Sequence, residues 1–190
     1  MTDLTLIVPC KGDDCHKLQL EEAPCPTIVI REHLYGDAIK CGLQRATTRY
    51  VATMDADGQH RLEDLQGLYE DLQYHRPDMV VGTRHRREIG PRDLSSRLLN
   101  LAASILAGTH VPDFGSGLRI MDREIALGYL ESLPAGFDFN AALTMAFLIN
   151  GHEVLWSVIP GRPRAHGKSH VRVTDGVKTL ISLAKGYDRR

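Results

Sequence analysis

Residues 50–60 read YVATMDADGQH, so two carboxylates and one amide follow closely on an apolar stretch. Asp55, Asp57 and Gln59 stand at every second position, and on an extended backbone this spacing points all three side chains the same way. Carboxylate and amide oxygens are hard ligands that suit Mg²⁺ or Mn²⁺, with phosphate oxygens and water completing the shell. The alternative interpretation is a polar turn in which Asp57 caps a helix that begins near Arg61. The spacing alone leaves both interpretations open.

A second group of chemically suited side chains is the basic segment 82–97, which reads GTRHRREIGPRDLSSR. Clustered guanidinium groups directly after a strand suit phosphate recognition, because arginine donates charge-assisted and often bidentate hydrogen bonds. We expect Arg86 and Arg87 to lie in a solvated loop. The other arginines of the segment are then the candidates for contact with a phosphate: Arg84, Arg92 and Arg97.

A third segment, residues 161–172, contains four lysine and arginine side chains and no acidic one. Gly167 permits close approach of the backbone, and Lys168 with Ser169 can donate hydrogen bonds to an anion. The segment is not a P-loop, because Arg162 stands where the upstream glycine of that motif is required. One acidic and two basic segments therefore describe a metal-assisted site for a phosphorylated or diphosphate ligand.

Apolar patterning predicts the elements that must position these segments. Short apolar runs are typical of buried strands, predicted at 4–9, 27–30, 50–54, 78–84, 116–122 and 152–160. Apolar residues at helical spacing predict helices at 35–47, 61–75, 94–108, 139–151 and 171–187. This alternation predicts an α/β architecture with a mostly parallel sheet. Ligands of such sheets bind outside the carboxyl ends of the strands, where Asp55 and Arg84 stand.

The composition fits one soluble globular domain over residues 1–190, with 43% hydrophobic and 25% charged residues. A net charge of −1 gives no overall attraction to nucleic acid, so we expect no nucleic-acid partner. No apolar stretch reaches the roughly 20 residues that cross a bilayer. We therefore expect a cytoplasmic protein, with any contact at the inner face of the membrane being peripheral. The four cysteines lack a paired C-x-x-C spacing, which favours reduced thiols over a zinc site.

Five ordered motifs between residues 35 and 170 resemble the polyprenyl-phosphate glycosyltransferases of glycosyltransferase family 2, the group that includes dolichol-phosphate mannose synthase. The first is similar to a glycine-containing helix of that family, and the second to its D-x-D-x-Q-H motif. The third resembles G-[ST]-R followed by R-x-x-x-S, the fourth D-x-x-[ST]-G-[FL]-R, and the last R-x-x-G-x-S-[KR]. They stand at residues 35–46, 54–60, 80–100, 111–124 and 159–170, with FDFN at 137–140 before the last.

The resemblance implies a GT-A fold, the three-layer α/β sandwich of nucleotide-diphospho-sugar transferases. It also implies a metal-dependent glycosyltransferase that moves a sugar from a nucleotide-diphosphate donor to a polyprenyl-phosphate acceptor and inverts the anomeric centre. An acceptor phosphate is already a nucleophile at neutral pH, so this reaction needs no strong general base. The implied site residues are Asp55, Asp57 and Gln59 for Mg²⁺ or Mn²⁺; Arg164 and Ser169, beside Lys168, for the donor diphosphate; Arg84, Arg92 and Ser96 for the acceptor phosphate; and Asp57 with Asp113 as catalytic or site-organising carboxylates.

The front of the chain departs from the family pattern. Family members follow the first strand with a helix, a strand and a helix that hold the nucleotide base and ribose, and residues 10–26 are too short for these. Leu34 also stands where a glycine is usual, and His170 where lysine or arginine is common. The shortening favours an alternative: a noncatalytic or repurposed relative that binds a polyprenyl phosphate or sugar phosphate, or serves as a subunit of a partner enzyme. The predicted helix 171–187 could lie on a membrane, pack on the core, or form a homodimer.

Overall fold

The computed structural model describes residues 1–10, 20–32, 34–85, 91–113 and 115–162, and of residues 85 and 91–96 it describes the backbone alone. Six strands in this part of the chain form one sheet in the order β2-β1-β3-β5-β4-β6. Strand β5 runs antiparallel to both of its neighbours, and all other neighbouring strands are parallel. The strands are β1 (Leu4–Cys10), β2 (Thr27–Arg31), β3 (Tyr50–Thr53), β4 (Met79–His85), β5 (Arg119–Asp122) and β6 (Val154–Pro160).

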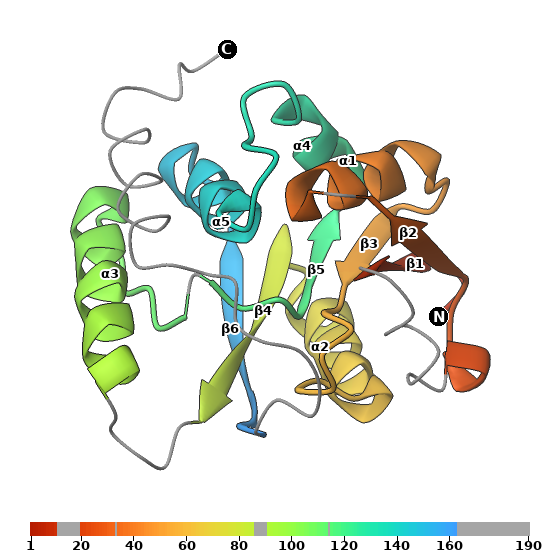
Figure 1. Ribbon diagram of the computed structural model, residues 1–190, viewed down its shortest axis with the longest axis horizontal. Coiled ribbons are helices and arrows are strands. Elements are labelled where there is room, and N and C mark those ends of the chain that lie inside the picture. The colour runs from red at the N-terminus through yellow and green to blue at the C-terminus, as the bar shows by residue number, and fades with distance from the viewer. Residues whose placement is uncertain (11–19, 33, 86–90, 114, 163–190) are drawn as a thin grey trace.

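Helices cover both faces of this sheet, as Figure 1 shows. Helix α2 packs on one face against β4, β5 and β6, whereas α1, α4 and α5 lie on the other face, and α3 packs against α5. This arrangement confirms the predicted three-layer α/β sandwich with a mostly parallel sheet. The helices are α1 (Tyr35–Arg45), α2 (Leu62–His75), α3 (Pro91–Ala107), α4 (Arg123–Gly128) and α5 (Phe139–Ile149), with a 3-10 turn η2 (Leu20–Glu22) before β2.

The strands are apolar on both faces because each face is covered by helices. In β1, Leu6 joins the core cluster on the α2 side together with Leu68, and the next residue, Ile7, joins the cluster formed with Leu43 and Phe147. All five side chains are fully buried. A strand buried on both faces reads as a continuous apolar run rather than as an alternating one. This double burial explains why the short apolar runs predicted the strands.

The structure differs from the predicted elements at several ends. The helix predicted to begin at residue 94 begins at Pro91, where the fixed φ and missing N–H of proline suit a first turn. The strand predicted over 116–122 begins only at Arg119. Helix α4 was not predicted, and the Asp122 side chain caps it by accepting hydrogen bonds from two backbone N–H groups at 3.0 and 3.3 Å. The helix predicted over 171–187 lies outside the described residues.

The first turn of α1 is clamped onto the loop that precedes α5. The Gly36 N–H donates to the carbonyl oxygen of Ala135 at 2.7 Å, and Lys40 Nζ donates to the carbonyl oxygen of Leu133 at 2.6 Å. The two segments approach so closely that a Cβ atom at residue 36 would lie 2.5 Å from the carbonyl oxygen of Pro134. Only glycine therefore fits here, and the start of α1 is fixed relative to the start of α5.

Two features bear on redox state and membrane contact. Cys10, Cys25 and Cys41 are free thiols, and burial is the main cause that raises the pKa of Cys25. Among the helices that the structure describes, none is both long and apolar enough to cross a bilayer.

Gly36→Ala is expected to destabilise the protein, because the added methyl group would collide with the backbone of the loop before α5. Overpacking of this kind typically costs about 1–3 kcal/mol. Gly67→Ala is the matched control: a Cβ atom there meets nothing within 4 Å, and alanine inside a helix is favoured by roughly 0.5–1 kcal/mol. Urea unfolding measures both variants, and equal stability of the two would contradict the clamp.

Candidate functional site

The candidate residues meet at the edge of the sheet where β3 and β4 end. Asp55 comes two residues after the last residue of β3, and Arg84 is the penultimate residue of β4. Because β5 runs antiparallel to both strands, the segment that precedes it reaches the same edge. There the Thr53 hydroxyl donates to the carbonyl oxygen of Gly117 at 3.0 Å. The antiparallel strand is therefore what brings Asp113 into the site.

The Asp55 carboxylate is held by side chains from two other elements. The Tyr35 hydroxyl donates to Asp55 Oδ1 at 2.6 Å, and Asn140 Nδ2 donates to the Tyr35 oxygen at 2.7 Å. Burial, and then the charge and hydrogen bond of Asp55, raise the pKa of Tyr35 well above its ordinary value, so the phenol stays a donor. On its other side the carboxylate lies against Gly117, where a Cβ atom would overlap Asp55 Oδ2.

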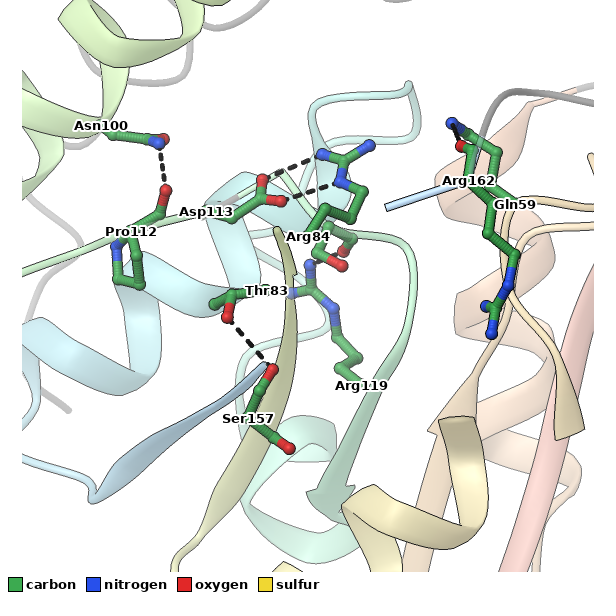
Figure 2. Close-up of polar contacts among 10 residues, drawn as sticks. Gln59, Thr83, Arg84, Asn100, Pro112, Asp113, Arg119, Ser157 and Arg162 are labelled. Carbon is green, nitrogen blue, oxygen red and sulfur yellow. Dashed lines mark hydrogen bonds and ion pairs between the residues drawn. The ribbon is translucent and has the colours of Figure 1, made fainter. Parts of the chain in front are cut away.

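Asp57 and Gln59 lie in a tight turn after Asp55. The Gln59 N–H donates to Asp57 Oδ1 at 3.0 Å, and Gly58 between them has a φ of 78°, which glycine adopts without strain. The Gln59 side chain donates from Nε2 to the carbonyl oxygen of Arg162 at 3.2 Å (Figure 2). This turn therefore connects the acidic motif to Arg162, the first basic residue of the segment 161–172.

The interpretation of Asp57 as the cap of α2 is wrong. Helix α2 is capped by Asp64, whose Oδ2 accepts a hydrogen bond from the Arg61 N–H at 2.9 Å. Asp64 lies in the first turn of the helix and reaches back to the residue before it, as the acidic member of a capping box does. The role that the alternative gave to Asp57 is thus filled by another carboxylate.

Arg84 and Asp113 form a bidentate ion pair, drawn in Figure 2. Arg84 Nε donates to Asp113 Oδ2 at 2.8 Å and Arg84 Nη2 donates to Oδ1 at 3.0 Å. The side chains are only 19% and 14% exposed. Burial alone would lower the pKa of Arg84, but the charge and hydrogen bonds of Asp113 outweigh it and raise that pKa. Both oxygens of Asp113 are engaged, which favours a site-organising role over that of a base.

Arg119 is a fully buried cation beneath these carboxylates, and the sequence analysis did not select it. Its Nη1 donates to the Asn140 carbonyl oxygen and to Thr144 Oγ1, each at 2.7 Å, and its Nη2 donates to the Ser116 carbonyl oxygen. Burial lowers the pKa of Arg119 to about 10, although the negative charge of Asp55 opposes this, so the group stays charged at neutral pH. The arginine of the fourth motif was the signal that could have identified it.

Three buried polar atoms near Arg119 have no hydrogen-bond partner in the described part of the chain: Arg119 Nε, Ser116 Oγ and Asn140 Oδ1. Nearby, His60 is 3% exposed and its Nδ1 also lacks a partner among the described residues. Burial is the main cause that lowers the pKa of His60, so its imidazole is neutral at neutral pH. Unsatisfied buried groups are uncommon in folded proteins and tend to mark functional regions.

A second bidentate ion pair anchors Arg162, the first basic residue of the segment 161–172. Both terminal nitrogens of Arg162 donate to the carboxylate of Asp64, from Nη2 to Oδ1 at 3.1 Å and from Nη1 to Oδ2. The Asp64 side chain is 4% exposed. The hydrogen bond to Asp64 is the main cause that raises the pKa of Arg162. Residue 162 is therefore fixed to the first turn of α2, beside the acidic motif.

The structure thus brings five of the predicted site residues to one edge of the sheet: Asp55, Asp57, Gln59, Arg84 and Asp113. Arg92 and Ser96 lie in the first two turns of α3, and their side chains are not described. Arg164, Lys168 and Ser169 lie outside the described residues.

No three His, Cys, Asp or Glu side chains in the described ranges form a metal cluster. The predicted metal site has two carboxylates, with an amide as its third ligand.

The sequence model for glycosyl transferase family 2 matches residues 18–129, which is more than half of the chain. The chain belongs to glycosyltransferase family 2. The family predicted from the ordered motifs is therefore confirmed.

Relatives in this family act on lipid-linked phosphates according to their names. The chain is 31% identical over 148 residues to a dodecaprenyl-phosphate galacturonate synthase of Rhizobium johnstonii, which covers 77% of this chain and 43% of that protein. It is 29% identical over 160 residues to an undecaprenyl-phosphate 4-deoxy-4-formamido-L-arabinose transferase of Pseudomonas fluorescens, covering 82% of this chain and 45% of the relative. This family 2 chain therefore spans less than half the length of these relatives.

Solved structures establish the fold of this family 2 chain. Glucosyl-3-phosphoglycerate synthase from Mycobacterium tuberculosis, in complex with Mn²⁺, UDP-glucose and phosphoglyceric acid, superposes with a TM-score of 0.74 at 14% identity, over 98% of this chain and 81% of that one. The same enzyme in complex with phosphoglyceric acid gives a TM-score of 0.70 at 13% identity, over 98% of this chain and 81% of that one. The predicted GT-A fold is confirmed.

Gly117→Ala is expected to displace Asp55, because the new Cβ atom would overlap its carboxylate. We expect a loss of about 1–3 kcal/mol in the free energy of unfolding, the usual cost of overpacking. Gly115→Ala is the matched control, since a Cβ atom at that position meets nothing within 4 Å. Urea unfolding compares the two, and a Gly117→Ala variant as stable as Gly115→Ala would contradict the packing described for Asp55.

Proposed function

We propose that this chain transfers a sugar, with inversion, from a nucleotide-diphosphate donor to a polyprenyl-phosphate acceptor in a reaction that depends on a divalent cation. The observation that carries the proposal is the acidic turn of Asp55, Asp57 and Gln59 beside the Arg84–Asp113 pair in a family 2 chain. An acidic group and a basic group at one sheet edge suit a metal-bridged diphosphate and a second phosphate. The names of the relatives support a polyprenyl-phosphate acceptor.

The charges of the site fit a divalent cation. Among the side chains that the structure describes, Asp55, Asp57 and Asp113 face two guanidinium groups, those of Arg84 and Arg119, which leaves one negative charge in excess. Mg²⁺ or Mn²⁺ would offset that excess, and Asp55, Asp57 and Gln59 would hold it through hard oxygen ligands. When bound, the ion would stabilise charge on the departing diphosphate. The Mn²⁺ in glucosyl-3-phosphoglycerate synthase supports the same choice by analogy of fold.

The position of Arg162 supports a donor-binding role for the segment that follows it. Arg162 is fixed to α2 through Asp64, and its carbonyl oxygen accepts the hydrogen bond of Gln59. Arg162 therefore lies directly beside Gln59, one of the proposed metal ligands. We assign the donor diphosphate to the basic and hydroxyl side chains of that segment: Arg164, Lys168 and Ser169.

Helix α3 supports a lipid acceptor. Its first two turns carry Arg92 and Ser96, and a helix N-terminus favours phosphate. Farther along, Leu98, Leu101 and Ile105 are 60%, 58% and 73% exposed and stand at spacings of three and four residues, which is one face of a helix. A phosphate end followed by an apolar face suits a polyprenyl phosphate at a membrane surface. We accordingly place the protein at the cytoplasmic face of a membrane through peripheral contact.

The proposed reaction needs few groups from the protein. The acceptor phosphate oxygen attacks the anomeric carbon opposite the departing diphosphate, which inverts that centre. Arg84 would bind the acceptor phosphate through N–H groups other than the two that Asp113 holds, since a guanidinium offers five. Asp113 would then act by orienting Arg84. Asp57 would act as a metal ligand rather than as a base.

One observation favours the alternative of a binding protein without turnover. In the part of the chain that the structure describes, only the 3-10 turn η2 lies between β1 and β2, and these strands pair directly. The family segment that holds the nucleotide base has no counterpart in that described connection. A repurposed relative would keep the phosphate contacts and lose nucleotide binding. A homodimer formed through residues 171–187 stays a prediction.

Asp57→Ala is expected to remove metal-dependent binding of the donor nucleotide. Isothermal titration of UDP, GDP, UDP-glucose and GDP-mannose, with and without Mn²⁺, should show one nucleotide binding in the presence of the metal. The variant should weaken that binding by at least roughly 100-fold, because even partners behind metal ligands contribute 10- to 100-fold. Asp71→Ala on α2 is the matched control and should bind normally. Wild-type protein that binds none of these but binds a short polyprenyl phosphate would favour the alternative function.

A triple variant, Leu98→Ser with Leu101→Ser and Ile105→Ser, is expected to lose binding to phosphatidylglycerol vesicles that contain undecaprenyl phosphate. Burying one such side chain contributes about 1.5–3 kcal/mol, so losing three should weaken binding at least roughly 100-fold. Val158→Ser is the control, since Val158 is 74% exposed on β6. Vesicle co-sedimentation measures both proteins. Unchanged sedimentation of the triple variant would show that α3 does not contact the lipid.

A further inference from the structure

Asp55 lies just beyond the last backbone hydrogen bond that joins β3 to the sheet. The last backbone hydrogen bond of β3 with β1 runs from the Met54 N–H to the Ile7 carbonyl oxygen at 3.1 Å. Beyond that bond the orientation of the Asp55 carboxylate depends on its side-chain contacts. The first of these is the 2.6 Å hydrogen bond from the hydroxyl of Tyr35, the first residue of helix α1.

The direction of this hydrogen bond follows from the Asp55 carboxylate, which can only accept, and it is matched by the donor on Asn140. Its Nδ2 donates to the Tyr35 oxygen at 2.7 Å, and a phenol has a single proton to give. With its oxygen accepting from the amide, the Tyr35 hydroxyl directs its proton to Asp55. Asn140 is itself 4% exposed, and its backbone carbonyl oxygen accepts from the buried guanidinium of Arg119 at 2.7 Å. The backbone of Asn140 is therefore fixed beside the hydroxyl to which its side chain donates.

The Tyr35 ring is also fixed, so the hydroxyl has little freedom to leave the carboxylate. Tyr35 is the first residue of α1, and its ring stacks on Phe137 with a centroid distance of 5.3 Å and an interplanar angle of 24°. The next residue, Gly36, is clamped by its 2.7 Å hydrogen bond to Ala135. These contacts fix Tyr35 to the loop that precedes α5.

We propose that Tyr35 and Asn140 are positioning residues that preorganise Asp55 for the divalent cation. The proposal deepens the proposed function and rests on its metal site. A hydrogen bond to a metal-ligating carboxylate restricts its rotation, and partners behind the ligands typically contribute 10- to 100-fold in metal affinity. Asn140 acts through Tyr35, because the contact that ends on the carboxylate is that of the phenol.

Tyr35→Phe tests this role, since it keeps the stacked ring and removes the hydroxyl. The matched control is Tyr69→Phe, which removes a tyrosine–aspartate hydrogen bond of the same 2.6 Å length, from Tyr69 to Asp3, away from the site. We would titrate Mn²⁺ alone into metal-free protein, follow free Mn²⁺ by electron paramagnetic resonance, and record urea unfolding. Tyr35→Phe should weaken Mn²⁺ binding by about 10-fold or more. Tyr69→Phe should leave it unchanged while the urea midpoint falls in both.

Asn140→Ala and the double variant with Tyr35→Phe provide the second measurement. Asn140→Ala should weaken Mn²⁺ binding on its own and add nothing further when Tyr35 is already phenylalanine, because residues in one network are not additive. Additive effects in the double variant would overturn the proposed order of contacts. This arm stays informative if either single variant folds poorly, since the other single variant still reports on the metal.

Asp57→Ala separates failure of this proposal from failure of the proposed function. If Asp57→Ala abolishes Mn²⁺ binding and Tyr35→Phe leaves it unchanged, the positioning role is overturned and the proposed metal site is retained. If the Asp57→Ala variant instead binds Mn²⁺ as tightly as the wild-type protein does, the metal site is overturned, and with it the role of Tyr35 and Asn140.

Discussion

A buried guanidinium group, that of Arg119, ties the sheet to α5 beneath the candidate site. A charge removed from water is costly unless hydrogen bonds and opposite charges compensate it. Here α5 supplies a backbone carbonyl and the Thr144 hydroxyl, Ser116 supplies a second carbonyl, and Asp55 lies near enough to favour the charged form. Because the hydrogen bonds of its two terminal nitrogens form only in this arrangement, β5, α5 and the acidic turn must assemble together. The buried charge thus lies near Asp55 and Asp113 and partly offsets their negative charge.

The antiparallel strand β5 is the topological feature that completes the site. In a wholly parallel sheet, the residues before a strand lie at the edge opposite to the carboxyl ends. Reversal of β5 instead brings Asp113 and residues 115–119 to the edge where β3 and β4 end. Asp113 can then reach Arg84 although 29 positions separate them in the sequence. The acidic half and the basic half of the proposed site are joined by this reversal.

Much of the fold and half of the site could be predicted from local patterns. Strands buried on both faces are continuous apolar runs, so β1 and β3 were visible, and with β3 came Asp55 at its end. The ordered motifs identified the family and selected Arg84 and Asp113. Helix α4 was not predicted because its six residues are too few to show helical periodicity. Arg119 was not selected as a site residue because a charged residue at the end of a strand is ordinarily exposed to solvent.

The sequence by itself determined the α/β class, the family and the carboxylates that follow β3, because these depend on apolar periodicity and residue spacing along a short stretch of chain. Only the tertiary structure decided what each carboxylate touches. Asp55 is oriented by Tyr35 and Asn140, Asp64 rather than Asp57 caps α2, and Arg162 is anchored through the same Asp64. Such contacts join elements that are distant in sequence, and they form where helices and strands approach closely enough for a hydroxyl or guanidinium to meet a carboxylate. No local pattern records that approach.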